Sequence, residues 1–112
     1  MADRTPTTGG RRQKVLRAAG LTLDLESRQV AGPHGTVWLT PKECQLLAVF
    51  MSHAGQILSR KFLMSEVWHT DYLDDTRTLD VHICYLRRKI EQDPHRPRLL
   101  RTVRGVGYRF AQ

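Results

Sequence analysis

The chain has 112 residues, the length of one domain, since soluble domains cluster at roughly 100–150 residues. Apolar residues make up 40% and charged residues 26%, so a core can form without disulfides or a structural metal. Two cysteines, Cys44 and Cys84, exclude a disulfide scaffold and a four-cysteine zinc site, and we expect both to be reduced. Because the sequence lacks a run of about 18 apolar residues and a secretory signal, we expect a soluble, cytoplasmic protein with no membrane partner.

The formal net charge is +7, and the last third of the chain carries most of it. Residues 76–112 contain nine basic and three acidic residues, whereas residues 15–75 contain five basic and seven acidic ones. Such a basic region suits a polyanionic partner, but a solvated basic face that only improves solubility has the same composition. Residues 1–14 are rich in Thr, Gly and Arg, which predicts a disordered tail or interdomain linker and leaves 15–112 as the folded domain.

Short apolar stretches separated by turn residues fill the region from 15 to 39. Leu21, Leu23 and Leu25 alternate with polar residues, which places three leucines on one face of a strand. The turn signals are Gly20, the Glu26–Ser27 corner and Gly32 to Gly35. We therefore expect a small antiparallel sheet of three or four strands.

Two helices are expected next. Thr40 suits an N-cap, Pro41 suits the first turn and Glu43 completes a capping box, before an apolar stripe that ends ahead of Gly55. The stripe consists of Leu46, Leu47, Phe50 and Met51. After a brief extended piece at 57–58, Ser59 is expected to cap a second helix over 60–68. Its expected buried residues are Leu63, Met64, Val67 and Trp68.

The strongest helical periodicity lies in residues 76–92. The apolar residues there are spaced four, three and four apart: Leu79, Ile83, Leu86 and Ile90. Pro94 and Pro97 follow the helix. Two strands, Leu99–Val103 and Tyr108–Phe110, are then expected to form a hairpin around a glycine-containing turn. Three helices followed by a hairpin is the layout of a winged helix.

The face of helix 76–92 opposite the apolar stripe suits a groove of DNA. At 100° per residue it carries Arg77, Val81, Cys84 and Arg88, with further polar residues on the flanks. One flank holds Thr78, His82, Tyr85 and Lys89, and the other holds Asp80 and Arg87. An α-helix fits the major groove, where arginine contacts phosphate and guanine. Val81 suits a thymine methyl group, although isolated exposed apolar residues are common without any such role.

The hairpin turn adds a second positive feature. Arg104 is followed by Gly105 and Gly107, which gives a slim basic tip. Arginine is well suited to a narrow minor groove, and an ordinary glycine-containing turn is the alternative interpretation.

Motifs for catalysis are lacking, so we expect no enzyme, cofactor or metal. The sequence has no dinucleotide or P-loop motif and no His-x-x-x-His pair. Cys44 lies on a helix expected to be buried and is interpreted as an inert core thiol. Asp80 and His82 diverge by about 200° on a helix, and Asp74–Asp75 suit a helix start better than a catalytic pair.

Five motifs occur in the order typical of one family. They are Leu39–Glu43 (LTPKE), Ile57–Arg60 (ILSR), Val67–Trp68, Arg77–Ile83 (RTLDVHI) and Thr102–Phe110 (TVRGVGYRF). Over about residues 15–112 the chain resembles the C-terminal effector domain of OmpR/PhoB-type response regulators. The combination of the last two motifs is far more specific than any single feature above.

The resemblance implies an α+β winged helix-turn-helix with a four-stranded N-terminal sheet, three helices and a C-terminal wing. It implies sequence-specific binding of double-stranded promoter DNA for transcription regulation, as the output domain of a two-component phosphorelay system. Members bind direct-repeat half-sites as homodimers and contact RNA polymerase, while a receiver domain controls them. We expect the isolated domain to be a monomer.

The resemblance also implies roles for individual residues. Expected at the DNA backbone are Trp68, Arg77, Thr78, His82, Arg87 and Thr102. Expected at bases or in a groove are Val81, Cys84, Tyr85, Arg88 and Arg104. Asp80 is expected to brace the helix start or neighbouring basic residues. Asp71 and Asp74 in the loop 69–75 would face polymerase, although a solvated connection that caps the next helix is the alternative for Asp74 and Asp75.

Two departures from the family pattern limit this transfer. Cys84 and Tyr85 stand where relatives often carry arginine, asparagine or another polar residue, so the target sequence cannot be borrowed. A receiver domain is absent, and the tail over 1–14 favours an effector fragment over a receiver-free relative. Two rival functions remain: a winged helix that docks an acidic protein, and a small hydrolase or nuclease.

Overall fold

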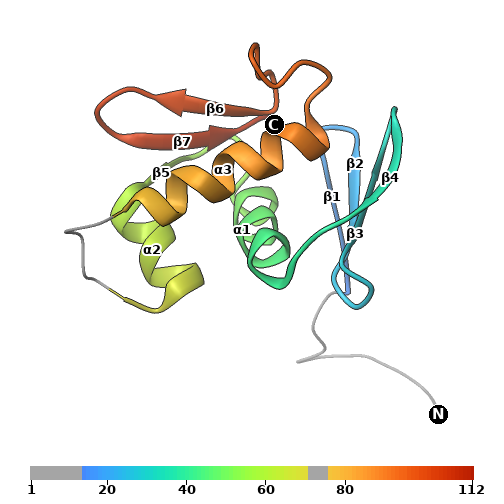
Figure 1. The fold of residues 1–112 in the computed structure, drawn as a ribbon, viewed down its shortest axis with the longest axis horizontal. Helices are drawn as coiled ribbons and strands as arrows, with labels where there is room; N and C mark the ends of the chain where they lie inside the picture. Colours follow the sequence, from blue (N-terminus) through green and yellow to red (C-terminus); the bar gives the residue numbers. More distant parts are fainter. Residues whose placement is uncertain (1–13, 71–75) are drawn as a thin grey trace.

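Figure 1 shows the computed structural model, which describes residues 14–70 and 76–112. The predicted tail, apart from Lys14, therefore lies outside the described residues, and so do Asp71, Asp74 and Asp75. The described chain forms two antiparallel sheets and three α-helices. Among these residues no helix is long and apolar enough to cross a membrane.

The first sheet has four strands, as the resemblance implied. They are β1 (Val15–Ala18), β2 (Leu21–Asp24), β3 (Gln29–Gly32) and β4 (Gly35–Trp38), paired in that order. Leu23 lies opposite Val30, and Leu21, Leu23 and Val30 are buried. The predicted third leucine of this face, Leu25, follows β2 and is only partly buried.

Helix α1 (Pro41–Ser52) begins with the predicted capping box. The backbone N–H of Glu43 donates to Thr40 Oγ1 at 3.2 Å, and the Thr40 N–H donates to Glu43 Oε1 at 2.9 Å. The predicted apolar stripe of α1 is buried, so the helix forms the centre of the core. It packs against both other helices and against a strand of each sheet.

Helix α2 (Arg60–Trp68) begins as predicted, because Ser59 Oγ accepts a hydrogen bond from the Phe62 N–H. Leu63, Met64 and Val67 are buried. The prediction of a buried Trp68 is wrong: its ring packs only partly against the core, between Lys42 and His82.

Helix α3 (Arg77–Ile90) is shorter than the predicted 76–92, although its four apolar residues are buried as predicted. The helix ends because Glu91 adopts an extended backbone with φ −87° and ψ 144°. This conformation turns the chain away before Pro94 and Pro97 are reached.

The second sheet contains β5 (Ile57–Ser59), β6 (Leu100–Val103) and β7 (Gly107–Phe110) in the order β5-β7-β6. The β6–β7 hairpin is the predicted wing, with the first residue of each strand shifted by one position and both last residues as predicted. The extended piece at 57–58 was predicted, but its pairing with the wing was not. Gly107 permits this pairing, because a Cβ there would lie 2.0 Å from the Leu58 carbonyl oxygen.

Candidate nucleic-acid interface

The outer face of α3 is exposed along its length, as predicted. Arg77, Val81, Cys84, Tyr85 and Arg88 all lie on the surface. Val81 is 44% exposed and Tyr85 is 43% exposed, although both are large hydrophobic residues of a kind often buried in a core. Within the part of the chain that the structure describes, the Arg88 side chain has no ion-pair partner. The face therefore presents both cationic and apolar groups to solvent.

Three aromatic rings extend this face from α2 onto α3. The ring centroids of Trp68 and His82 are 5.1 Å apart, and those of His82 and Tyr85 are 6.0 Å apart. Lys42 fixes one end, because its Nζ donates to the Val67 carbonyl at 2.8 Å and lies 5.8 Å from the Trp68 ring centroid. The ring contact places Trp68 at the end of α2 beside His82 on α3, so two residues predicted to contact the DNA backbone are neighbours.

The His82 ring has a defined orientation. Its Nδ1 lies 2.8 Å from the Thr78 carbonyl oxygen, and since a carbonyl only accepts, Nδ1 carries the proton. The opposite nitrogen, Nε2, is left for contacts outside α3. Thr78 thus contributes its backbone to positioning His82.

Arg87 connects α3 to the wing. Its Nε donates to the Leu100 carbonyl at 3.0 Å, and its Nη2 donates to Thr102 Oγ1 at 2.9 Å. Its guanidinium carbon also lies 5.7 Å from the Tyr108 ring centroid. Because arginine can only donate, Thr102 accepts here and its own hydroxyl proton remains available for another acceptor. Arg87 and Thr102, both predicted backbone contacts, are therefore neighbours.

Asp80 braces a neighbouring basic residue, as expected. Arg60 at the start of α2 forms two hydrogen bonds with its carboxylate, at 2.7 and 2.9 Å. Tyr108 from β7 donates its hydroxyl proton to Asp80 Oδ1 at 2.6 Å. Arg60 also contacts the carbonyl and hydroxyl oxygens of Thr76, which precedes α3. Asp80 thus joins three elements and is not directed at a ligand.

The environment of Asp80 keeps it ionised. The hydrogen bonds from Arg60 lower the pKa of the Asp80 carboxyl, and this effect outweighs the opposing effect of burial. Burial and the bond to Asp80 raise the pKa of Tyr108, so its hydroxyl keeps its proton at neutral pH.

A second ion pair fixes α3 to the core helix. Lys89 Nζ lies 2.5 Å from Glu43 Oε1 on α1, and the Glu43 side chain is only 4% exposed. Burial raises the pKa of Glu43, but the hydrogen bonds from Lys89 and Thr40 together outweigh it and leave the pKa below its ordinary value. Lys89 therefore stabilises the packing of α3 against α1, although it lies on a flank of the outer face of α3.

The wing tip presents Arg104 to solvent. The Val106 N–H donates to the Val103 carbonyl at 2.9 Å, and Gly105 has a φ of +77°, a conformation that glycine adopts without strain. Arg104 is exposed and has no ion-pair partner among residues 14–70 and 76–112. The tip therefore offers a cation beside a narrow glycine-containing turn, as predicted.

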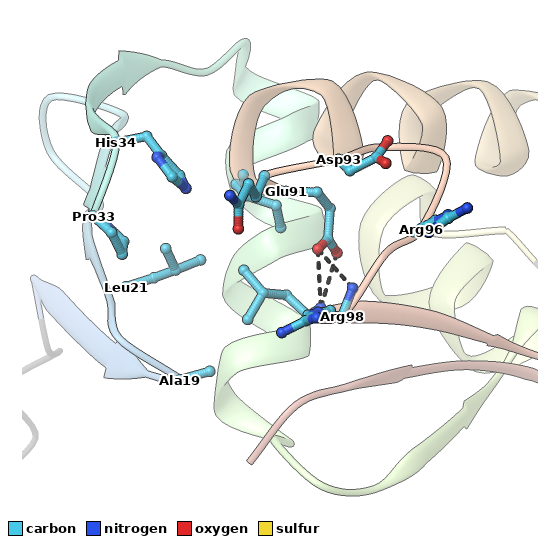
Figure 2. Close-up of a pocket in the computed structure, with 11 residues that line it drawn as sticks. Ala19, Leu21, Pro33, His34, Glu91, Asp93, Arg96 and Arg98 are labelled. Atoms are coloured by element: carbon cyan, nitrogen blue, oxygen red, sulfur yellow. Dashed lines mark hydrogen bonds between the residues drawn. The ribbon is translucent and has the colours of Figure 1, made fainter.

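A groove of about 660 Å³ lies at the far end of α3, between the first sheet and the α3–β6 connection (Figure 2). Charged residues at its wall include Glu91, whose carboxylate accepts hydrogen bonds from the backbone N–H groups of Arg98, Leu99 and Leu100. These bonds fix the connection that leads into the wing. Among the described residues no three metal-ligating side chains cluster, in this groove or elsewhere.

Four residues that hold α2, α3 and the wing in place had no predicted role: Lys42, Arg60, Glu91 and Tyr108. A signal for Glu91 was present, because Asp80, Arg87 and Glu91 are seven and four residues apart and so share one edge of a helix. Arg60 and Tyr108 gave no such signal, since they lie 20 and 28 positions from Asp80 in the sequence. Cys44 is buried as predicted, and burial raises the pKa of its thiol.

Comparisons with known proteins agree on one family. Residues 34–110 match the family model described as "Transcriptional regulatory protein, C terminal". The chain is 45% identical over 96 residues to the alkaline phosphatase synthesis transcriptional regulatory protein SphR of Synechococcus elongatus, covering 86% of this chain and 37% of SphR. It is 44% identical over 96 residues to the sensory transduction protein RegX3 of Mycobacterium tuberculosis, covering 86% of this chain and 42% of RegX3. The chain thus spans well under half the length of these relatives.

Solved structures show the same fold. The DNA-binding domain of Klebsiella pneumoniae RstA, in complex with the RstA box, aligns with a TM-score of 0.78 and 33% identity. The alignment covers 88% of this chain and 98% of that domain. DrrB, an OmpR/PhoB homologue from Thermotoga maritima, aligns with a TM-score of 0.76 and 29% identity, covering 90% of this chain and 46% of DrrB.

Proposed function

Because this chain belongs to the family of C-terminal DNA-binding domains of OmpR/PhoB-type response regulators, we propose that α3 inserts its outer face into the major groove of promoter DNA. The observation that carries this proposal is the exposed outer face of α3, on which Val81, Tyr85 and Arg88 are presented to solvent. Arg104 enters the adjacent minor groove from the wing. The folded unit that does this is residues 15–112, and residues 1–14 act as a tail or linker.

The residues of the interface divide into two groups by their chemistry. Those that contact phosphates are Trp68, Arg77, Thr78, His82, Arg87 and Thr102. Those that meet bases or a groove are Val81, Cys84, Tyr85, Arg88 and Arg104. The available hydroxyl proton of Thr102 supports its place in the first group, and the exposed apolar surface of Val81 supports its place in the second.

We further propose that the domain is the output half of a cytoplasmic two-component regulator. Phosphorylation of a receiver domain promotes dimerisation, and two weak half-site contacts then act together through a raised effective concentration. The dimer occupies direct repeats, and the loop that contains Asp71 and Asp74 contacts RNA polymerase. The isolated domain is a monomer that binds one half-site weakly.

Selection of duplexes from a random pool tests the proposal. The 112-residue protein is expected to enrich one short motif, and the enriched duplex is expected to compete against an excess of unrelated DNA. Affinity falls steeply as the salt concentration rises, because neutralised phosphates release counterions. Failure to enrich any motif, or affinity that does not change with salt, would contradict the proposal and favour docking of an acidic protein.

A further inference from the structure

The edge of α3 that faces the wing carries a second stripe of residues. Asp80 and Arg87 lie about 20° apart at 100° per residue, away from the apolar stripe that enters the core, and Glu91 follows as the C-cap of the same helix. Figure 1 shows the hairpin of β6 and β7 running alongside this helix. Each of the three residues contacts the hairpin or the chain that leads into it. Each of these contacts is a hydrogen bond.

The three contacts hold different parts of the wing. Glu91 accepts from the backbone N–H groups that lead into β6, including that of Leu100 at 2.7 Å. Arg87 holds the middle of β6 through the Leu100 carbonyl and Thr102. Asp80 holds the tip-proximal part of β7 through the Tyr108 hydroxyl. A hairpin fastened at these three levels cannot tilt relative to α3 without breaking hydrogen bonds to charged groups, which are stronger than neutral ones.

Tyr108 lies at the centre of this arrangement. Its hydroxyl donates to Asp80, while the Arg87 guanidinium lies over its ring. Asp80 is in turn held by Arg60 from α2, so the position of β7 depends on both helices of the helix-turn-helix. Tyr108 is 6% exposed and opposite Thr102 in the register of the hairpin. The Tyr108 side chain is therefore shielded from solvent by the hairpin to which it belongs.

We infer that Tyr108, through Asp80 and Arg87, is a positioning residue that sets the wing against α3, so that Arg104 and α3 reach their two grooves together. This inference rests on the proposed function. B-DNA presents its grooves at fixed spacing, so a wing that is free to tilt places Arg104 in the minor groove only part of the time. Tyr108 itself does not touch DNA.

A double-mutant cycle tests the inference. The 112-residue protein and the duplex enriched by selection are used, with Tyr108→Phe, Arg104→Ala and the double variant. Tyr108→Phe is expected to weaken binding about tenfold, the factor that one hydrogen bond to a charged group carries. The double variant is expected to bind only slightly more weakly than Arg104→Ala alone, because the groove contact of Arg104 carries most of the value of wing position and Thr102 is the only other wing residue proposed at DNA. Additive effects of the two substitutions would overturn the inference.

Two controls separate positioning from stability. Tyr108→Phe combined with Arg88→Ala is expected to be additive, because Arg88 lies on α3 and not on the wing. Ile83→Val shortens a buried side chain of α3 and lowers the melting temperature without touching the wing, so its DNA affinity is expected to stay unchanged. Loss of affinity in Ile83→Val equal to that in Tyr108→Phe would assign the effect to stability and overturn the inference.

A pair of variants at the exposed end of the network gives a second test. Thr102→Val removes the acceptor for Arg87 while keeping the side-chain shape, and Thr102→Ser keeps the hydroxyl. Hydroxyl-radical footprinting, which reports access to the minor groove, is expected to show weaker protection for Thr102→Val and full protection for Thr102→Ser. Because Thr102 is also a proposed phosphate contact, Thr102→Val is combined with Arg104→Ala: loss of a phosphate contact adds to the effect of Arg104→Ala, whereas loss of wing position is expected to add little. This test decides the question if Tyr108→Phe does not fold. If the wild-type protein binds DNA and the effects of Tyr108→Phe and Arg104→Ala are additive, only this inference is contradicted. If the wild-type protein does not bind DNA, the proposed function is contradicted as well.

Discussion

Helices α1 and α3 have similar lengths, 12 and 14 residues, but use their surfaces in opposite ways. Six residues of α1 are buried, and it packs against both other helices and both sheets. Only four residues of α3 are buried, on one stripe, while Val81 and Tyr85 on the other side remain exposed. Helix α1 thus builds the core, whereas α3 buries one stripe and presents its opposite face to solvent.

An ion pair joins the two helices and helps to hold α3 in place while its outer face stays exposed. Glu43 is buried on α1, and Lys89 reaches it from a flank of α3. Together with the buried apolar stripe and the wing contacts of Asp80, Arg87 and Glu91, this pair fixes α3 on three sides and leaves the fourth open. A recognition helix needs such support, because side chains reach base edges only from a backbone held at a definite depth.

Truncating one side chain on α1 and one on α3 is the strongest test of the contrast between a buried and an exposed helix. Phe50 is fully buried on α1, so Phe50→Ala is expected to lower the free energy of unfolding by about 3–5 kcal/mol. Tyr85→Ala on α3 is expected to change it by less than about 0.5 kcal/mol, because the side chain lies on the surface. Urea denaturation measures both. Comparable losses in the two variants would break the distinction between a core helix and a recognition helix.

Breaking the link between the helices is expected to have the next largest effect. Lys89→Met leaves the Glu43 carboxylate buried without its cation, which is expected to cost about 3 kcal/mol. Combining it with Glu43→Gln is expected to restore part of this loss, because the unpaired charge is removed. Thermal denaturation of the single and double variants measures the recovery. No recovery would mean that Lys89 stabilises the fold by packing alone.

Acid provides a smaller test of the same pair. The pKa of Glu43 is lower in the folded protein than in the unfolded chain, so its ionised form stabilises the fold. This contribution is fully present above the ordinary glutamate pKa of about 4.3 and is lost as the pH falls through the lowered folded value. Glu43→Gln is therefore expected to flatten the acid side of the stability profile. An unchanged profile, measured by urea denaturation between pH 3 and 7, would contradict this role.

The smallest effect on the fold is expected on the recognition face itself. Arg77→Ala is expected to leave stability within about 0.5 kcal/mol of wild type and to weaken binding of all duplexes alike. The slope of log affinity against log salt is expected to fall by about one, because one phosphate contact is lost. Val81→Ala and Tyr85→Phe are instead expected to change the motif enriched by selection. The same motif from these variants would contradict their role in base recognition.

Local patterns in the sequence predicted the elements well, and long-range contacts less well. The capping box of Thr40 and Glu43 and the spacing of Leu79, Ile83 and Leu86 depend on neighbours three or four residues apart, which periodicity describes directly. The pairing of β5 with β7 depends on a register between distant segments, which no local pattern contains. Helical periodicity identified the exposed face of α3, and the family resemblance gave the bracing role of Asp80. It did not identify Arg60 and Tyr108 as the partners, since their contacts exist only once the helices and the wing are packed.

Chemical-shift mapping of the 112-residue protein with the enriched duplex tests the central claim most directly. The backbone amides of Arg77, Val81, Cys84 and Arg88 on α3, with Arg104 at the wing tip, are predicted to shift most on titration. Amides of α1 and of the four-stranded sheet are predicted to move little. Large shifts confined to that sheet, with the outer face of α3 unaffected, would contradict the assignment of α3 as the DNA-reading element.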